Sequence, residues 1–337
     1  MPQPRFIADA FGVLTIISIG ILILLGLFCI AYSLYLRSRI RNQTLHHLAF
    51  FTSPWLIRII FILLAILWCV GEFLRLSLLR RKGNPLAHLN SKWQEAICKG
   101  YIVSNLGFTE PCLFLTLLLL LRAPLNITSG ILSPHWTRKT SSILLLSTSP
   151  IFLLHLLIIL LSQTSTIRHS LPLKFTRSST RSNGASLCAY PLLNTILVGI
   201  LVTVLTTYLL WIGRRILKRV INKVLQRRVY VILVAVASLF PMRVVFIGVS
   251  VMSEPDKVLY EIAAFMGFFC LVWCLGVCIC LAVYLPVADA LSLGGEGSEV
   301  ISLVDESDNR QSISFRNAFV ELSLFAPTHQ SSSSSAF

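Results

Sequence analysis

The stretch Trp211-Ile-Gly-Arg-Arg-Ile-Leu-Lys-Arg-Val-Ile-Asn-Lys-Val-Leu-Gln-Arg-Arg228 separates two apolar runs, each long enough to cross a bilayer. It has no acidic residue, and its seven basic residues are Arg214, Arg215, Lys218, Arg219, Lys223, Arg227 and Arg228. A short loop this rich in Lys and Arg marks the cytoplasmic side of a membrane protein. Aliphatic residues fall between the bases at helical spacing, which predicts one helix with a basic and an apolar face. We therefore expect a cytoplasmic extension that joins two transmembrane helices.

The composition of the whole chain is typical of a membrane protein. Of its 337 residues, 55% are hydrophobic and 13% are charged, whereas soluble domains carry about 25% charged residues. The mean hydropathy is +0.79. The chain also has a net charge of +15. Its basic residues lie mainly in short loops, where membrane topology and anionic lipid head groups account for them, so nucleic-acid binding is not expected.

Seven apolar segments follow one another along the chain. At about 1.5 Å per residue, each can cross a hydrocarbon core of roughly 30 Å. Their ranges are 12–36, 55–79, 100–121, 143–161, 191–213, 229–252 and 259–285. The third is the least hydrophobic, because Asn105, Thr109 and Glu110 lie in its first half. We therefore expect an all-α integral membrane protein built as a bundle of seven transmembrane helices.

The distribution of Lys and Arg predicts the orientation of this bundle. The first, third and fifth loops and the C-terminal tail together carry more Lys and Arg than the other loops, and the fifth loop supplies the difference. Because basic loops stay in the cytoplasm, the N-terminus is expected outside and the C-terminus in the cytoplasm. The chain then divides into a short extracellular N-terminus (1–11), the bundle (12–285) and a cytoplasmic tail (286–337). The tail is acidic and rich in Ser, so we expect it to be disordered.

Two of the nine cysteines lie in predicted loops. Cys98 precedes the third span and Cys188 precedes the fifth, so both face the outside in the expected orientation. An oxidising exterior allows them to form a disulfide that ties the loop to the start of the third helix. The other cysteines lie within spans, where Cys is a common small apolar residue, and we expect no metal site.

Six polar or charged residues lie in the outer half of the predicted bundle: Glu72, Arg75, Asn105, Glu110, Arg243 and Glu261. Ionisable residues within a membrane are costly and are candidates for function by default. Because unpaired charges there would be especially costly, we expect the pairs Glu72–Arg75 and Glu110–Arg243. Three roles are consistent with this arrangement: ion pairs that fix the helix register, an outward-opening ligand pocket, or a proton or ion pathway.

Motifs of soluble enzymes are missing from the sequence. It has no pair of His at metal-binding spacing within a span, no nucleophile elbow and no phosphate-binding loop. We therefore expect no enzymatic activity and no cofactor. His155 stands alone on the apolar fourth span, which favours a hydrogen-bonded core residue over a ligand.

Several features together resemble those of a G-protein-coupled receptor: seven spans, a short outer N-terminus, the two outer cysteines, a basic fifth loop and a Ser-rich tail. Two rhodopsin-class motifs are missing. The third span ends Leu120-Leu-Arg122-Ala-Pro without an Asp/Glu-Arg-Tyr triplet, and the seventh ends Tyr284-Leu-Pro-Val-Ala-Asp289 without Asn-Pro-x-x-Tyr. As a whole, the chain resembles the plant candidate G-protein-coupled receptors, the group that includes a proposed phytomelatonin receptor. The resemblance implies a plasma-membrane receptor for a small molecule that acts with a heterotrimeric G-protein α subunit.

The stretch 211–228 is the expected site for the α subunit, because a basic and apolar helix can dock into an acidic or apolar groove. The same stretch can instead anchor on anionic lipid, where each base contributes about 1 kcal/mol. Two other functions are consistent with the sequence. One is a small transporter or channel that uses Glu110 and Arg243 as a polar relay, and the other is a membrane scaffold that recruits cytoplasmic factors through its tail.

Overall fold

The structure is a computed structural model that describes residues 3–42, 55–76, 91–122, 134–161, 179–182, 185–188, 190–219, 223–253 and 258–289. Nearly all of these residues are helical. The α-helices are α1 (Gln3–Asn42), α3 (Trp55–Arg75), α4 (Ser91–Tyr101), α5 (Glu110–Arg122), α6 (Pro134–Leu161), α9 (Leu192–Arg219), α10 (Lys223–Met252) and α11 (Val258–Cys278). Two further segments, η4 (Ile102–Thr109) and η6 (Ile279–Tyr284), are π-helical.

Seven helical stretches of the described chain are long and apolar enough to cross a membrane. The third consists of α4, η4 and α5 in succession, and the seventh of α11, η6 and the residues up to 289. This finding confirms the predicted number of apolar helices and indicates a multi-pass membrane protein. Some helices extend beyond the apolar runs, since α6 begins at Pro134 and α9 ends at Arg219.

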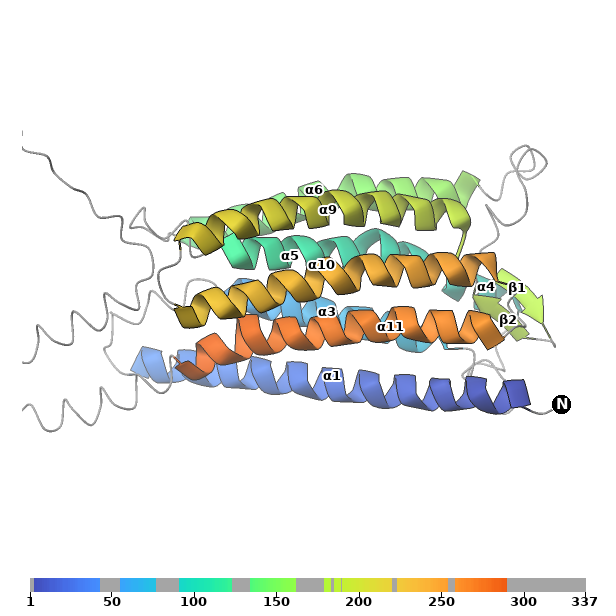
Figure 1. The fold of residues 1–337 in the computed structure, drawn as a ribbon, viewed down its shortest axis with the longest axis horizontal. Coiled ribbons are helices and arrows are strands. Elements are labelled where there is room, and N and C mark those ends of the chain that lie inside the picture. Colours follow the sequence, from blue (N-terminus) through green and yellow to red (C-terminus); the bar gives the residue numbers. More distant parts are fainter. Residues whose placement is uncertain are drawn as a thin grey trace, which may run out of the picture.

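The helices lie side by side along the long axis of the bundle (Figure 1). α10 packs against both α9 and α11, and α11 also packs against α1. The third span lies in the interior, since 78% of an apolar 18-residue stretch of it is buried, against at most 50% for the corresponding stretch of any other span. A helix shielded from lipid by its neighbours can carry polar residues, which explains why this span has the least hydrophobic sequence.

Both π-helical segments precede a proline. η4 ends two residues before Pro111, and η6 ends two residues before Pro286. Proline removes a backbone donor, and its ring clashes with the carbonyl four residues earlier in an ordinary α-helix. A wider helical turn relieves this clash, and such turns are frequent at functional sites. In the third span, the wider turn ends directly before Glu110.

The two ends of the bundle differ in character. β1 (Ser179–Ser182) and β2 (Ala185–Cys188) form an antiparallel hairpin, which adds two short strands to the predicted all-α fold. This hairpin lies beside α4 and at the same end as the N-terminus (Figure 1), and we call it the hairpin end. α9 ends and α10 begins at the opposite end, which we call the basic end after its residues 214–219 and 223–228.

The predicted domain boundaries differ from the helix ends. α1 begins at Gln3, so most of the segment predicted as a short N-terminus (1–11) belongs to the first helix. At the other end, the helix continues to residue 289, past the predicted boundary at 285. The predicted tail beyond residue 289 lies outside the described residues.

Candidate functional site

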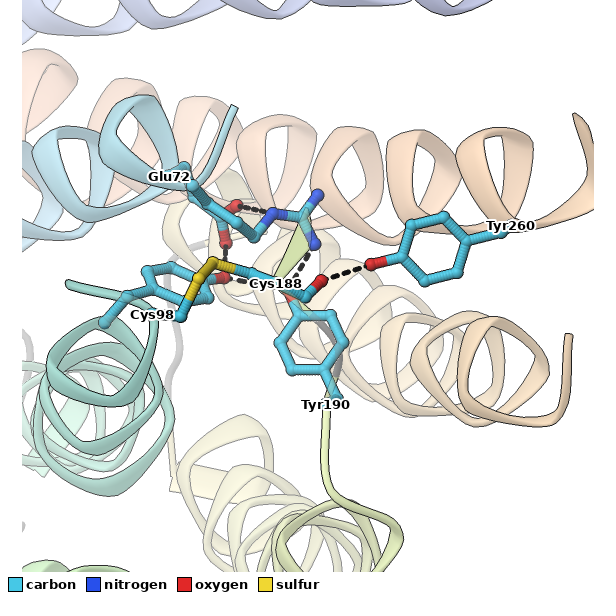
Figure 2. The surroundings of a disulfide bond; sticks show 7 residues. Glu72, Cys98, Cys188, Tyr190 and Tyr260 are labelled. Carbon is cyan, nitrogen blue, oxygen red and sulfur yellow. Dashed lines mark hydrogen bonds and ion pairs between the residues drawn. A yellow bond between two sulfur atoms is a disulfide. The ribbon is translucent and has the colours of Figure 1, made fainter. Parts of the chain in front are cut away.

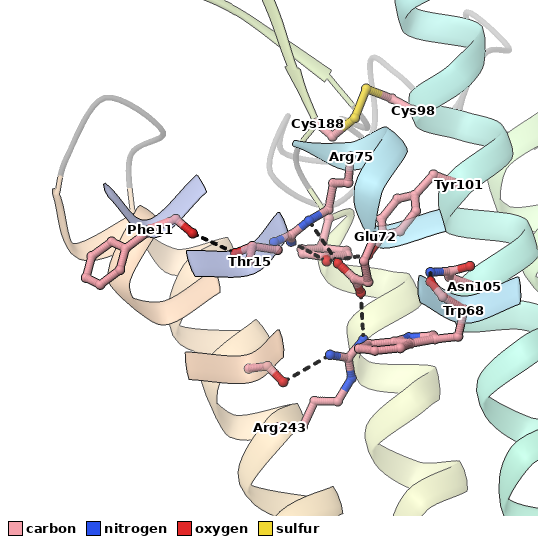
Figure 3. Close-up of polar contacts among 12 residues, drawn as sticks. Phe11, Thr15, Trp68, Glu72, Arg75, Cys98, Tyr101, Asn105, Cys188 and Arg243 are labelled. Atoms are coloured by element: carbon pink, nitrogen blue, oxygen red, sulfur yellow. Dashed lines mark hydrogen bonds and ion pairs between the residues drawn. A yellow bond between two sulfur atoms is a disulfide. The ribbon is translucent and has the colours of Figure 1, made fainter. Parts of the chain in front are cut away.

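Arg243 of α10 belongs to a buried cluster of charged side chains, and Figure 3 shows it next to Glu72 and Trp68. Its guanidinium donates hydrogen bonds to Glu110 of α5 and to Oε1 of Glu72 of α3, the latter at 3.2 Å. A third hydrogen bond runs from Nη1 to the carbonyl oxygen of Gly267 in α11 at 3.0 Å. The Arg243, Glu72 and Glu110 side chains are 2%, 1% and 5% exposed. One side chain therefore connects four helices across the middle of the bundle.

Glu72 is shared by two arginines. Its Oε2 lies 3.3 Å from Nε of Arg75, one helical turn along α3, while its Oε1 accepts from Arg243. The predicted pairs Glu72–Arg75 and Glu110–Arg243 are both confirmed. Together these four residues carry no net formal charge, as burial requires, since an uncompensated charge in an apolar interior is strongly destabilising. We call Glu72, Arg75, Glu110 and Arg243 the buried ion cluster.

Trp68 closes the side of this cluster that faces away from the hairpin end. Its Nε1 donates to Oε1 of Glu110 at 3.2 Å, and its ring centroid lies 5.2 Å from the guanidinium carbon of Arg243. The same ring stacks on Phe268 of α11 with centroids 5.7 Å apart. Trp68 was not predicted from the sequence. Its position four residues before Glu72 puts both side chains on one face of α3. This spacing could have indicated that Trp68 lies beside the charged residues.

Two tyrosines close the side of the cluster that faces the hairpin end. Tyr101 donates from its hydroxyl to Oε1 of Glu72 at 2.9 Å, and its hydroxyl lies 2.8 Å from that of Tyr190. Arg75 donates to the Tyr190 hydroxyl, and its guanidinium lies over the Tyr190 ring, 5.3 Å from the centroid. Burial raises the pKa of Tyr190 above its ordinary value, so the phenol stays neutral near pH 7 and keeps its proton. Neither tyrosine was predicted.

The predicted disulfide between Cys98 and Cys188 is confirmed, with Cα atoms 5.4 Å apart (Figure 2). It joins the end of β2 to α4. Tyr260 of α11 donates a hydrogen bond to the carbonyl oxygen of Cys188, which ties the same point to a third element. Because Tyr190 follows Cys188 by two residues, this cross-link holds Tyr190 against Arg75 and Tyr101.

Asn105 borders the buried ion cluster from the π-helical segment η4. Its Nδ2 donates to the backbone carbonyl of Trp68 at 3.1 Å, so η4 and α3 are joined beside the cluster. This contact depends on Gly71, because a Cβ built there would overlap the amide group of Asn105. The close approach of η4 to α3 therefore requires a glycine at residue 71.

Gly71→Ala is expected to lower the free energy of unfolding by about 1–3 kcal/mol, because the added methyl group pushes Asn105 away from Trp68. Thermal unfolding in detergent measures this loss. Gly20→Ala on α1 is the matched control, because a Cβ there meets no atom within 4 Å. Its stability should equal or exceed that of the natural protein, since Ala favours helix over Gly. Equal effects of the two substitutions would contradict the close approach at Gly71.

Glu261 lies beside a small cavity at the hairpin end. Arg75 and Glu261 line this cavity together with Thr15 and Tyr260, and its volume is about 40 Å³. A space of this size holds about one water molecule, whose share of liquid volume is about 30 Å³. Of the six residues predicted for a ligand site, the structure thus joins four directly, places Asn105 beside them, and links Glu261 through the cavity at Arg75.

The basic residues of 211–228 are divided between two antiparallel helices, so the prediction of one continuous helix is wrong. α9 carries Arg214, Arg215, Lys218 and Arg219, and α10 carries Lys223, Arg227 and Arg228. The predicted alternation holds locally, since Ile212 and Ile216 are buried and Arg214, Arg215 and Lys218 are exposed. Arg228 bonds Asp289 at 2.5 Å, which ties the start of α10 to the end of the seventh span.

His155 of α6 is buried, as predicted, but the predicted hydrogen bond is not found. Within the described chain, neither of its ring nitrogens has a hydrogen-bond partner. A Cβ built on Gly107 of η4 would lie 3.0 Å from Cβ of His155. The small residue at 107 therefore lets η4 and α6 approach closely at the His155 ring.

Comparison with known proteins identifies one family. The family described as Uncharacterised conserved protein UCP031277 matches residues 1–300. The description of this family states no activity, so the match shows which family the chain belongs to and says nothing about its function. The comparisons with curated proteins and with solved structures gave no match. Because the match covers more than half of the chain, the protein belongs to the family described as Uncharacterised conserved protein UCP031277.

Proposed function

We propose that the protein is a plasma-membrane receptor of the G-protein-coupled type, with its N-terminus outside and its C-terminus in the cytoplasm. It binds a small extracellular ligand in the outer half of the bundle. It signals through a heterotrimeric G-protein α subunit that binds the basic end. The ligand site comprises the buried ion cluster with Asn105 and Glu261.

Two separate features support this orientation. The disulfide lies at the hairpin end, together with the N-terminus (Figure 1). Disulfides persist on the oxidising side of a membrane. The exposed bases of α9 and α10 lie at the opposite end, and Lys and Arg near span ends stay in the cytoplasm. Both features favour an extracellular hairpin end and a cytoplasmic basic end.

One chain of contacts carries the proposal. Arg75 lines the cavity at the hairpin end and binds Glu72, which in turn accepts a hydrogen bond from Arg243 in the middle of α10. The other end of α10 carries Lys223, Arg227 and Arg228. α10 therefore contacts the proposed ligand site through Arg243, and its basic residues at the other end form part of the proposed binding surface for the α subunit.

A change at Arg75 can reach the basic end by this route. A ligand group that binds the Arg75 guanidinium competes with Glu72 for it and alters the charge that faces Arg243. A ligand shifts a conformational equilibrium by the difference in its affinity for the two states. Here the two states differ in the contact between α3 and α10, so a ligand that prefers one state changes this contact. Movement of α10 then changes the position of its basic residues at the basic end, where the α subunit is proposed to bind.

Binding of a purified G-protein α subunit to the detergent-solubilised protein tests the proposal. Saturable binding is expected, and the variant with Arg214, Arg215, Lys218 and Arg219 all changed to Gln should lose it. The matched control changes Arg80, Arg81, Lys82 and Lys92 to Gln, which removes the same charge from the segment expected outside. This control should bind like the natural protein. Absence of binding by the folded natural protein contradicts the proposal and favours flux measurements on Glu110 and Arg243 instead.

A further inference from the structure

A cavity of about 410 Å³ lies between the third and fourth spans, away from the buried ion cluster. η4 and α6 supply its apolar walls, which are formed by Val103, Phe108, Phe152, Leu156, Ile159 and Leu160. Ligand sites in proteins are typically about 300–1,000 Å³ and mostly apolar, with a few polar groups that orient the ligand. This cavity has the size and the lining of a site for a molecule with a long apolar body.

Lys99 supplies a positive charge at the hairpin end of the cavity. It follows Cys98, so the disulfide holds this part of α4 in place. The Lys99 ammonium lies 2.7 Å from Oε1 of Glu95, and the two side chains are 22% and 47% exposed. An ion pair this exposed contributes little, so the ammonium can exchange Glu95 for another carboxylate at small cost.

Gly100 leaves space in the cavity wall next to Lys99. A Cβ built on Gly100 would meet no atom within 4 Å. Glycine inside a helix lowers helix stability by about 1 kcal/mol relative to Ala. No neighbouring atom lies close enough to Gly100 to require a glycine there. Gly100 therefore keeps volume open directly below the charged group.

The cavity reaches the outer surface of the bundle through α6. Leu160 lines it and is 54% exposed, and its neighbours Leu153 and Leu157 on the same helix are also exposed. In a bundle that spans a membrane, an exposed apolar face of this kind contacts the hydrocarbon. A ligand dissolved in the bilayer can therefore enter the cavity from the side.

We propose that this cavity binds a long-chain carboxylate from the membrane. The hydrocarbon chain lies against Phe108, Phe152 and Leu156, and the carboxylate binds the Lys99 ammonium. η4 forms one wall, carries Asn105 and ends directly before Glu110 of the buried ion cluster. The bound acid thus contacts the segment that borders this cluster. The inference does not rest on the receptor function, and its test needs no G-protein.

Equilibrium binding of radiolabelled oleate to the purified protein in phosphatidylcholine nanodiscs tests the site, with empty nanodiscs as the background. Oleyl alcohol, which has the same chain and no charge, is the comparison ligand. Lys99→Gln is expected to weaken oleate binding about tenfold, because it removes a charge-assisted hydrogen bond, and to leave oleyl alcohol binding unchanged. Glu95→Gln should strengthen oleate binding about two- to fivefold, because it removes the competing carboxylate.

Gly100→Leu fills the cavity and should abolish binding of both ligands. The matched control, Gly20→Leu, makes the same change at an open position of α1 and should bind both ligands normally. Because Leu favours helix over Gly, neither substitution should lower thermal stability. Unchanged oleate binding by Gly100→Leu overturns the proposed site. Equal losses of oleate and oleyl alcohol in Lys99→Gln overturn the assignment of the carboxylate to Lys99.

Discussion

Arg243→Met is expected to lower the free energy of unfolding by about 3–5 kcal/mol, because it leaves buried carboxylates without their guanidinium partner. Glu72 and Glu110 both bond Arg243, and both are almost fully buried. Met has an apolar side chain of comparable length, so packing changes less than charge. Unfolding of the purified protein in detergent, followed by loss of helical circular dichroism, measures the effect.

A charge-balanced variant separates the loss of charge pairing from a loss of packing. Glu110→Gln combined with Arg243→Met removes one charge of each sign and leaves the Glu72–Arg75 pair intact. Most of the lost stability should return, because neutral replacement of a whole buried pair is often tolerated. If the double variant is as unstable as Arg243→Met alone, charge balance does not explain the role of Arg243. The stability of Arg243→Lys should lie between those of the natural protein and Arg243→Met, since Lys keeps the charge but lacks the planar guanidinium that can bond two carboxylates.

Removal of the disulfide is the second large effect. The variant Cys98→Ser with Cys188→Ser should lose about 2–4 kcal/mol of stability, because the bond closes a loop between residues 90 apart in sequence. The loss should also release Tyr190, which follows Cys188 and contacts Arg75. Thermal unfolding of the two proteins with and without reductant measures the change.

Reductant provides the internal control for this prediction. It should lower the unfolding temperature of the natural protein towards that of the double Ser variant, whose own unfolding temperature should not respond. Cys280→Ser changes a partly buried free cysteine and should leave both the stability and the reductant response unaltered. A natural protein that is insensitive to reductant under unfolding conditions would argue against a stabilising role for the disulfide.

The helical part of the fold could be predicted with simple physical rules. The thickness of a bilayer sets the length of an apolar run, so counting such runs was sufficient to find the seven helices that are long and apolar enough to cross it. Pro134 and Arg219 show the limit of this rule. Helices continue past the apolar core wherever backbone hydrogen bonds can continue, so apolar runs such as 143–161 underestimate α6.

Part of the site could also be predicted. Glu72 and Arg75 are one helical turn apart, and this spacing alone indicates a pair. The pair of Glu110 and Arg243 followed from the cost of leaving either charge unpaired in the bundle. Neither argument specified that Glu72 would also bond Arg243, because this contact depends on how α3 and α10 are rotated about their axes.

The sequence by itself determined the helical class of the fold, the number of long apolar helices, the disulfide and two ion pairs. These properties depend on local composition, on spacing within one helix and on the cost of burying charge. Only the tertiary structure decided that Trp68, Tyr101 and Tyr190 enclose the ion cluster and that a cavity opens between η4 and α6. The physical reason is packing. Close approaches at small residues such as Gly71 and Gly107, together with the wider turn before Pro111, set which faces of distant helices meet.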